Sequence, residues 1–207
     1  MIPTKIKAIA WDIDGTLIDS EPVHHMALMA VSARYGLEIA ADDTRFIGVA
    51  MGDVWKVLTP HYPPDLERDI WLAEIVEAYI EHKAELQPIP GAPETVLALA
   101  KAGLVQCAVS NSSRRIVEAN LKAMGIDHVM SFAIAREDVT HGKPDPEPYR
   151  LACTRLGFQA PYVLAVEDSV VGAQSARAAG MPVLRYGADL TDFGALLDQV
   201  AGRRLRA

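Results

Sequence analysis

Short apolar segments recur along the chain, and each is bounded by Gly, Pro, Asp or Asn. They lack the alternation of apolar and polar residues found in strands with one face in water. They therefore predict strands of a parallel sheet that is covered on both faces. Four such strands are expected, followed by a shorter fifth: Ile6–Trp11, Val105–Ser110, Phe132–Ala135, Val163–Val166 and Val183–Arg185.

Helical patterns occupy the intervals between these strands. The segment Ala92–Ala102 places Val96 and Leu99 on one face and ends at Gly103, and a glycine commonly follows the end of a helix. Three later helical segments also end at a glycine: Ser113–Met124, Glu147–Leu156 and Val170–Ala179. Strands that alternate with helices predict right-handed βαβ units and a doubly wound α/β sheet.

The segment from residue 20 to 87 interrupts this alternation. It contains apolar helical patterns, such as Trp71, Ile75 and Tyr79, but no clear strand, and turn-rich sequence flanks it on both sides. We therefore expect a core of residues 1–19 and 88–207 with an all-helical insert of residues 20–87. Because ligands of such sheets bind beyond the carboxyl ends of the strands, an insert directly after the first strand is expected to cover the site as a lid.

Composition and charge narrow the classes of partner. The 207 residues are 50% hydrophobic and 23% charged, an ordinary globular balance. A net charge of −7 argues against a nucleic-acid partner, since such proteins neutralise phosphates with Lys and Arg. A small anionic substrate is compatible with this net negative charge, because a bound metal can reverse the local electrostatic field. The apolar run Ile6–Trp11 is too short for a signal peptide or a membrane span. We expect a cytoplasmic monomer with no membrane partner.

The first predicted strand leads into Asp-Ile-Asp-Gly-Thr at residues 12–16. Both carboxylates are therefore expected at the carboxyl edge of the sheet. There Asp12 could attack a phosphorus atom and form an aspartyl phosphate, while Asp14 could protonate the leaving oxygen and later take a proton from water. Taken alone, the same pattern could simply form a turn or cap a helix.

The ends of three other predicted strands also carry polar groups. Ser110 and Asn111 follow the second strand and precede a helix, whose free N–H groups favour a phosphate. Lys143 follows the third strand in a proline-bounded loop, where it could neutralise a transferring phosphoryl group. Glu167 and Asp168 end the fourth strand, and carboxylate oxygens suit Mg²⁺. A helix cap or a surface lysine would explain each separately, but together they predict one magnesium-dependent phosphoryl-transfer site.

These motifs resemble those of the haloacid dehalogenase-like superfamily, in particular its β-phosphoglucomutase and phosphoglycolate phosphatase group. The resemblance covers nearly the whole chain. It is carried by Asp-Ile-Asp-Gly-Thr at 12–16, Ser-Asn at 110–111, Gly-Lys-Pro at 142–144 and the segment from Glu-Asp-Ser at 167–169 to Gly-Met at 180–181. It implies a Rossmann-like core with a cap of four or five helices inserted after the first strand.

The resemblance also implies a role for each residue of the motifs. Asp12 would be the nucleophile and Asp14 the general acid/base. Mg²⁺ would be held by the carboxylates of Asp12 and Asp168 and by the backbone carbonyl of Asp14, with Glu167 beside them or acting through water. The phosphoryl oxygens would be held by groups at the ends of the second and third strands, namely Ser110, Asn111 and Lys143. Dehalogenating members typically lack the second aspartate, so Asp14 favours phosphate chemistry.

Two features of the insert bear on the type of phosphoryl transfer. His24 stands where mutases of the group, and also many phosphatases, place a histidine near the substrate. We count it as a substrate-binding candidate, although a histidine that only packs within the insert fits equally. Mutases usually carry an arginine near the position of Met51, which grips a second phosphate.

The absence of that arginine favours a phosphatase acting on a small phosphorylated metabolite, such as a sugar phosphate or a phosphorylated hydroxy acid. The alternative is a sugar phosphomutase of the β-phosphoglucomutase type. A non-catalytic binding domain is disfavoured by the presence of Asp14, since a binder has no need of an acid/base.

Overall fold

The computed structural model describes residues 6–204 and divides the chain into two compact units. Residues 20–86 form a helical unit, and the residues before and after it form a core unit. Gln87, which the sequence pattern assigns to the insert, belongs to the core because strand β3 (Gln87–Pro88) pairs antiparallel with β2 (Ile18–Asp19). The ends of the predicted core, residues 1–5 and 205–207, lie outside the described residues.

The core unit contains a five-stranded parallel sheet in the order β5-β4-β1-β6-β7. Its strands are β1 (Ala8–Trp11), β4 (Val105–Val109), β5 (Ala133–Ile134), β6 (Val163–Glu167) and β7 (Val183–Arg185). All residues of β1 and β6 are buried, which explains why the sequence of these strands does not alternate. The predicted doubly wound α/β class is confirmed.

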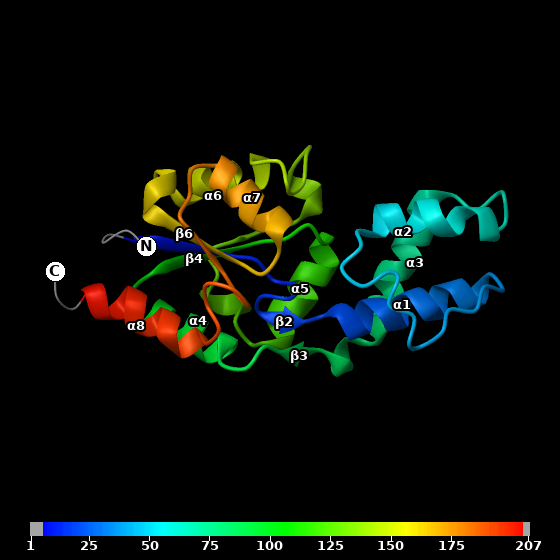
Figure 1. The fold of residues 1–207 in the computed structure, drawn as a ribbon, viewed down its shortest axis with the longest axis horizontal. Helices are drawn as coiled ribbons and strands as arrows, with labels where there is room; N and C mark the ends of the chain where they lie inside the picture. The colour runs from blue at the N-terminus through cyan, green and yellow to red at the C-terminus, as the bar shows by residue number, and fades with distance from the viewer. Residues whose placement is uncertain (1–5, 205–207) are drawn as a thin grey trace. The chain divides into compact units, whose positions relative to one another are not determined.

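Helices cover both faces of this sheet, with α6 and α7 on one face and α4 and α8 on the other (Figure 1). The helices of the core unit are α4 (Ala92–Lys101), α5 (Arg114–Ala123), α6 (Glu147–Leu156), α7 (Val170–Ala178) and α8 (Phe193–Arg204). The sequence pattern predicts the first four but not α8. Two glycines weaken the helical pattern of α8, and its fully buried Phe193 and Leu196 show that packing holds it in place.

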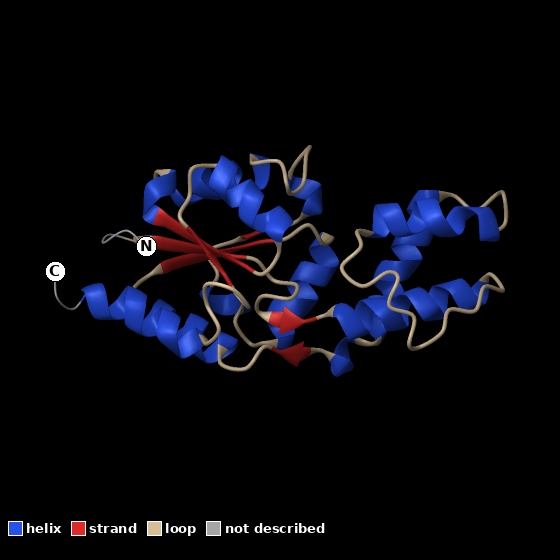
Figure 2. Cartoon of the chain, in the orientation of Figure 1, coloured by secondary structure: helices blue, strands red, loops and turns tan. Residues whose placement is uncertain are grey.

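The helical unit contains helices and loops only, throughout residues 20–86 (Figure 2). It consists of α1 (Glu21–Arg34), α2 (Met51–Leu58), α3 (Arg68–Glu81) and two single-turn 3₁₀ helices, Thr59–His61 and Lys83–Glu85. Aromatic rings form much of its interior. The ring centroid of Trp55 lies 5.3 Å from that of Trp71 and 5.9 Å from that of Tyr62.

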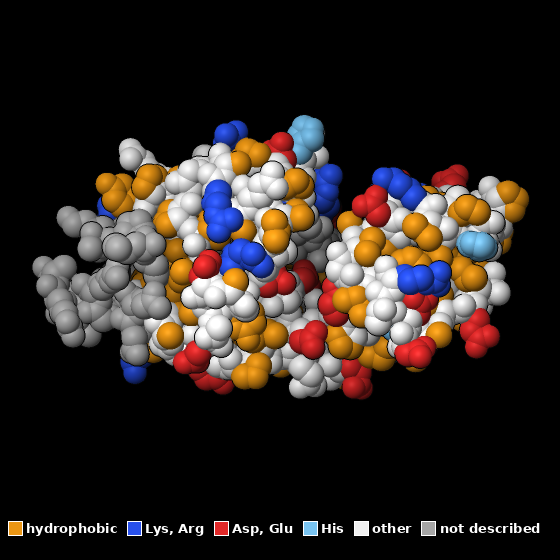
Figure 3. Space-filling model, viewed as in Figure 1, with side chains coloured by type: hydrophobic (Ala, Val, Ile, Leu, Met, Phe, Trp, Pro, Cys, Tyr) orange, Lys and Arg blue, Asp and Glu red, His pale blue; other side chains and the backbone are white. Residues whose placement is uncertain are grey.

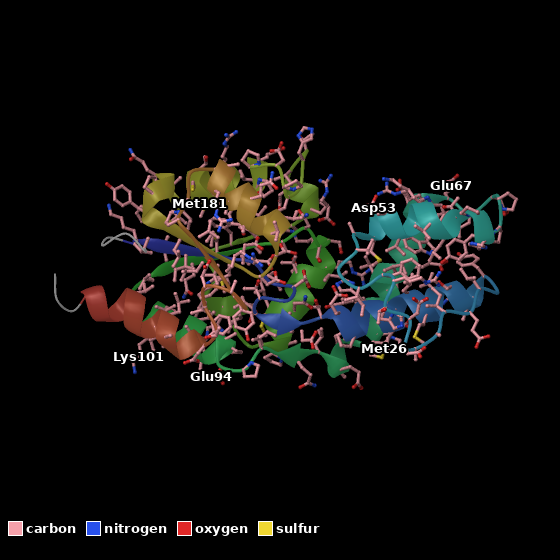
Figure 4. The ribbon with its side chains drawn as sticks, viewed as in Figure 1. Met26, Asp53, Glu67, Glu94, Lys101 and Met181 are labelled. Carbon is pink, nitrogen blue, oxygen red and sulfur yellow. The ribbon has the colours of Figure 1, made fainter. Side chains whose placement is uncertain are left out.

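Charged side chains of both signs are interspersed among apolar ones on the face drawn in Figure 3. Helix α4 illustrates how the sequence pattern separates the two environments. Val96 and Leu99 are buried beneath it, whereas Glu94 and Lys101 are exposed and point away from the core (Figure 4). Among the helices of the described residues, none is long and apolar enough to cross a membrane.

Candidate active site

The candidate site lies at the carboxyl ends of β1, β4 and β6, where the strand order of the sheet reverses. Strand β1 is central and pairs with β4 on one side and with β6 on the other. Asp12 directly follows β1, and its backbone N–H donates to the carbonyl of Val166 at 2.9 Å. Ser110 directly follows β4, and Glu167 ends β6. Such a switch point is the usual ligand-binding edge of an open α/β sheet.

Lys143 connects these strand ends through a buried ion cluster. Its Nζ lies 2.6 Å from Asp12 Oδ1 and 2.6 Å from Glu167 Oε1, and it donates to the carbonyl of Val109 at 2.8 Å. Only 4% of the lysine side chain is exposed. Tyr149 donates a further hydrogen bond of 2.5 Å to Glu167 Oε1. The ammonium is therefore held by three acceptors, two of which are carboxylates.

The electrostatics of the cluster follow from burial among like charges. Burial raises the pKa of Asp12 well above its ordinary value, the nearby Glu167 raises it further, and Lys143 opposes both effects. Burial likewise raises the pKa of Asp168, with a second contribution from Glu167. For Lys143, burial alone would lower the pKa, but the attraction of Asp12 and Glu167 outweighs it and raises the pKa. The single lysine therefore does not fully offset the burial and mutual repulsion of the acids.

The carboxylates themselves form a plausible cation site. One oxygen each from Asp12, Glu167 and Asp168 lies within 4.8 Å of the others. With all three acids ionised, three carboxylates against one ammonium leave two negative charges, which a divalent cation would balance. Carboxylate oxygens are also the donors that Mg²⁺ prefers. The donor set therefore fits magnesium in both charge and chemistry.

Thr16 and Gly15 shape this cluster from the turn after β1. The Thr16 hydroxyl donates to Asp12 Oδ2 at 2.8 Å and lies 3.3 Å from Asp168 Oδ1. Gly15 has a φ of +78°, and a Cβ atom at this position would overlap the carboxylate of Asp168. The turn therefore requires glycine for two reasons, its left-handed backbone and the close approach of an acid.

The side chain of Asp14 accepts hydrogen bonds from residues outside the carboxylate cluster. Its Oδ2 accepts from Ser110 Oγ at 3.0 Å and from Ser112 Oγ at 2.8 Å, and its Oδ1 accepts from Asn120 Nδ2 at 3.0 Å. Neither Ser112 nor Asn120 is among the residues that the sequence motifs single out for the site. A signal for Asn120 exists nevertheless, because it is a fully buried amide on the apolar face of α5.

Asn111 pairs with the backbone of Lys143. Its Oδ1 accepts from the Lys143 N–H at 2.9 Å, and its Nδ2 donates to the Lys143 carbonyl at 3.1 Å. The amide therefore fixes the loop that carries the lysine, and its direct contact with phosphate stays a prediction. His24 lies on α1 of the helical unit, where its ring centroid is 4.6 Å from that of Tyr79. Its contact with substrate also stays a prediction.

Comparison with known proteins agrees with this fold. The family model of the haloacid dehalogenase-like hydrolases matches residues 6–180. The chain is 33% identical to N-acetylmuramic acid 6-phosphate phosphatase of Pseudomonas aeruginosa, over 88% of this chain and 83% of that protein. It is 30% identical to fructose-1-phosphate phosphatase of Escherichia coli, over 84% and 92% of the two chains. The crystal structure of CbbY from Rhodobacter sphaeroides in complex with phosphate matches with a TM-score of 0.78 and 25% identity, over 86% and 84%.

An open α/β sheet with acids and a lysine at its switch point suits the class of enzymes that act on phosphate esters, because phosphoryl transfer depends on positioning and charge neutralisation. Within that class, the chain belongs to the haloacid dehalogenase-like hydrolase family. It is a phosphoric monoester hydrolase of that family, as the sequence predicts.

Gly172 offers a test of how closely the cluster is packed. A Cβ atom at Gly172 would overlap the carboxylate of Glu167, so Gly172→Ala must displace the acid that Lys143 binds. We expect a stability loss of about 1–3 kcal/mol, typical of overpacking, together with a clear loss of phosphatase activity. Urea unfolding and phosphate release measure the two effects.

Gly194→Ala is the matched control for this substitution. Gly194 is an exposed glycine of α8, and the nearest atom to a Cβ there is a carboxylate oxygen of Asp192 at 3.2 Å. That side chain can move aside, so activity should stay unchanged. Stability should change by less than about 1 kcal/mol, because the higher helix propensity of alanine opposes any weakening of the hydrogen bond from the Gly194 N–H to Asp192. If Gly172→Ala behaved like this control, the contact with Glu167 would have no energetic importance.

Proposed function

We propose that the protein is a magnesium-dependent phosphatase that hydrolyses a small phosphorylated metabolite through an aspartyl phosphate on Asp12. The observation that carries this proposal is the convergence of Asp12, Lys143, Glu167 and Asp168 at one buried sheet edge, where three carboxyl groups face one lysine. A divalent cation and a phosphoryl group would complete this arrangement. The phosphatases among the relatives support the same reaction.

In the first half of the reaction, a carboxylate oxygen of Asp12 forms a bond to phosphorus. The bond between phosphorus and the substrate oxygen breaks, and that oxygen keeps the bonding electron pair and takes a proton from Asp14. Lys143 and Thr16 hold the two oxygens of Asp12 and so fix the direction of attack. Positioning and charge neutralisation supply most of the acceleration, as in other phosphoryl transfers.

In the second half, Asp14 takes a proton from water while the water oxygen bonds to phosphorus. The bond between phosphorus and Asp12 breaks, which releases phosphate, returns Asp12 as a carboxylate and leaves Asp14 protonated. When Mg²⁺ is bound, the carboxylates of Asp12 and Asp168 and the backbone carbonyl of Asp14 would hold it, and it supplies positive charge opposite the phosphoryl oxygens. Glu167, which Lys143 and Tyr149 already engage, would act through water.

The helical unit would serve as the lid of this site. Its chain connections to the core are Ser20, after β2, and Leu86, before β3, where a change of backbone angles could open and close it. Such a lid favours a small substrate over a macromolecule. We propose that His24 contacts the substrate from this unit. Substrates of the relatives, an amino sugar phosphate and a sugar phosphate, are therefore sensible first candidates.

Phosphate release from a panel of metabolites tests the proposal. The panel contains N-acetylmuramic acid 6-phosphate, fructose 1-phosphate and phosphoglycolate. We expect release from at least one of them with Mg²⁺, loss of release with EDTA, and its recovery when Mg²⁺ is added in excess. The proposal would be overturned by metal-independent release or by no release from the panel or from aryl phosphates. Isomerisation of a sugar phosphate, stimulated by a trace of sugar bisphosphate and without net phosphate release, would identify a mutase instead.

A further inference from the structure

The loop that carries Lys143 depends on side chains for its shape. Residues 139–146 form neither helix nor strand, so their backbone N–H and carbonyl groups lack the partners that regular structure supplies. Arg136 binds the first part of this loop, where its guanidinium donates to the carbonyls of Val139 at 2.9 Å and Thr140 at 3.2 Å. The position of the loop is therefore set by the side chains around it.

Glu147, at the start of α6, holds the middle of the loop with both of its carboxylate oxygens. Oε1 accepts from the N–H of Thr140 and Oε2 from the N–H of His141, each at 2.8 Å. The imidazole Nδ1 of His141 also lies 3.2 Å from Oε2. The two backbone hydrogen bonds keep the pKa of Glu147 below its ordinary value, so the group is a carboxylate at neutral pH and accepts at both oxygens.

Asn111 holds the loop two residues further on. Its side-chain amide accepts from the N–H of Lys143 and donates to the carbonyl of the same residue. Gly142 is the one residue between the two attachments, and a Cβ atom there would lie 2.6 Å from Asn111 Oδ1. The backbone of Lys143 is therefore attached directly to Asn111 and, through a single glycine, to the segment that Glu147 binds.

The ammonium of Lys143 needs a backbone held in this way. Its Nζ fits between Asp12 Oδ1 and Glu167 Oε1, 2.6 Å from each, and only 4% of the side chain is exposed. The flexible four-carbon stem of a lysine does not by itself fix where its ammonium lies. A displacement of the loop would therefore displace the charge from this narrow position.

We propose that Glu147 is a positioning residue that fixes the backbone at Thr140 and His141 and so keeps the Lys143 ammonium beside the reacting phosphoryl group. This inference rests on the proposed function, in which Lys143 holds that group. Glu147 touches neither substrate nor metal in this scheme and acts only through the loop.

Glu147→Gln isolates this role, because glutamine has almost the shape of glutamate. Its amide has one acceptor oxygen and one NH₂ group, so it can accept from one backbone N–H but places a donor opposite the other. The Glu147 side chain is 35% exposed, so water can bind the N–H that loses its partner, and the fold should persist. Water does not fix the loop, however, and we expect kcat/KM for p-nitrophenyl phosphate to fall about tenfold.

A double-mutant cycle with Lys143→Met separates positioning of the lysine from general damage to the site. Without the ammonium, the loop has no charge to position, so Glu147→Gln should then lower kcat/KM less than about twofold. A merely structural role would give the same fold-loss in both backgrounds. The cycle is measured at a temperature at which circular dichroism shows all four proteins to be folded.

Hydrogen exchange gives a second measurement, which requires neither activity nor a folded Lys143→Met. The N–H of Lys143 is bonded to Asn111 in the wild type, and loosening of the loop in Glu147→Gln should speed its exchange about tenfold. Asp145→Asn is the matched control for both measurements. Its Oδ1 accepts from the N–H of Glu147 at 2.8 Å, and asparagine keeps this oxygen while removing the same charge from the same loop. Activity and exchange should stay at the wild-type level.

Wild-type activity of Glu147→Gln, equal losses in the two backgrounds, or unchanged exchange at Lys143 would each overturn the role of Glu147. The proposed function fails in a different way, because Asp12→Asn would then retain hydrolysis of p-nitrophenyl phosphate. An enzyme that depends on Asp12 and Lys143 but tolerates Glu147→Gln would keep the proposed function and reject this inference alone.

Discussion

Asp12→Asn is expected to abolish phosphate release while leaving the fold intact. A neutral amide is too weak a nucleophile to form the covalent phosphoryl intermediate, so the loss should be on the order of 10⁴-fold or more. The fold should tolerate the change, because Asn keeps the shape of Asp and Lys143 keeps its ion pair with Glu167. The change also removes a buried negative charge beside Glu167 and Asp168. The raised pKa of Asp12 reflects the cost of that charge. Hydrolysis of p-nitrophenyl phosphate and thermal unfolding measure the two effects.

Asp19→Asn is the matched control, since Asp19 is an exposed acid of the same segment. It should retain full activity and unchanged stability. Without Mg²⁺, Asp12→Asn should be at least as stable as the wild type, and added Mg²⁺ should stabilise it less, because one carboxylate of the cation site is gone. Near-normal turnover by Asp12→Asn would reject the nucleophile assignment and, with it, the proposed function.

The sheet could be predicted from sequence because its strands are short, apolar and separated by helices that end in glycine. Elements that tertiary contacts stabilise could not be predicted in this way. Strands β2 and β3 have two residues each, too few for any periodic signal. Helix α8 carries glycines that disfavour a helix, and burial of Phe193 and Leu196 stabilises it. Its formation therefore depends on a surface that only the folded core provides.

The candidate site also contains some residues that the sequence predicts and others that only tertiary contacts reveal. The topology alone brings the residues at the ends of neighbouring parallel strands to one edge of the sheet. The site residues that end or directly follow such strands are Asp12, Ser110, Glu167 and Asp168. The hydrogen-bond partners of the site residues depend on where side chains point from the helices and loops between the strands. Tyr149 reaches Glu167 from α6 in this way, and Ser112 and Asn120 reach Asp14 from the segment after β4.

Predictions that concern the helical unit or the whole molecule stay predictions. The contact of His24 with substrate and the role of residues 20–86 as a lid depend on the placement of the two units relative to each other. The monomeric state and the cytoplasmic location depend on interactions outside one chain.

Lys143→Met should cause the second large loss, in both stability and activity. The substitution keeps a long apolar side chain but leaves Asp12 and Glu167 facing each other without the ammonium that lies 2.6 Å from each. Removing one partner of a buried ion pair costs about 3–5 kcal/mol, because the remaining charge stays buried and uncompensated. Loss of a charged donor to the phosphoryl group should reduce turnover by about 10²–10³-fold. Urea unfolding and phosphate release measure these changes.

Two matched substitutions define what Lys143 contributes. Lys101→Met removes an exposed lysine of α4 and should change neither quantity. Lys143→Arg keeps the charge, but a planar guanidinium does not reproduce the compact ammonium, so an intermediate loss is expected. If Lys143→Met were as stable as Lys101→Met, the lysine would not compensate the buried acids.

The stability loss of Lys143→Met should also depend on pH and on magnesium. Lys143 lowers the pKa of Asp12, which burial and Glu167 raise, so its removal lets that pKa rise further. An acid with a pKa raised by folding binds protons in the folded state. Its contribution to stability is therefore present at low pH and is lost as pH rises through the folded pKa. The variant should thus be weakened more at neutral pH than in mild acid, and Mg²⁺ should restore part of the loss at neutral pH, because the cation replaces the missing positive charge beside Asp12 and Asp168.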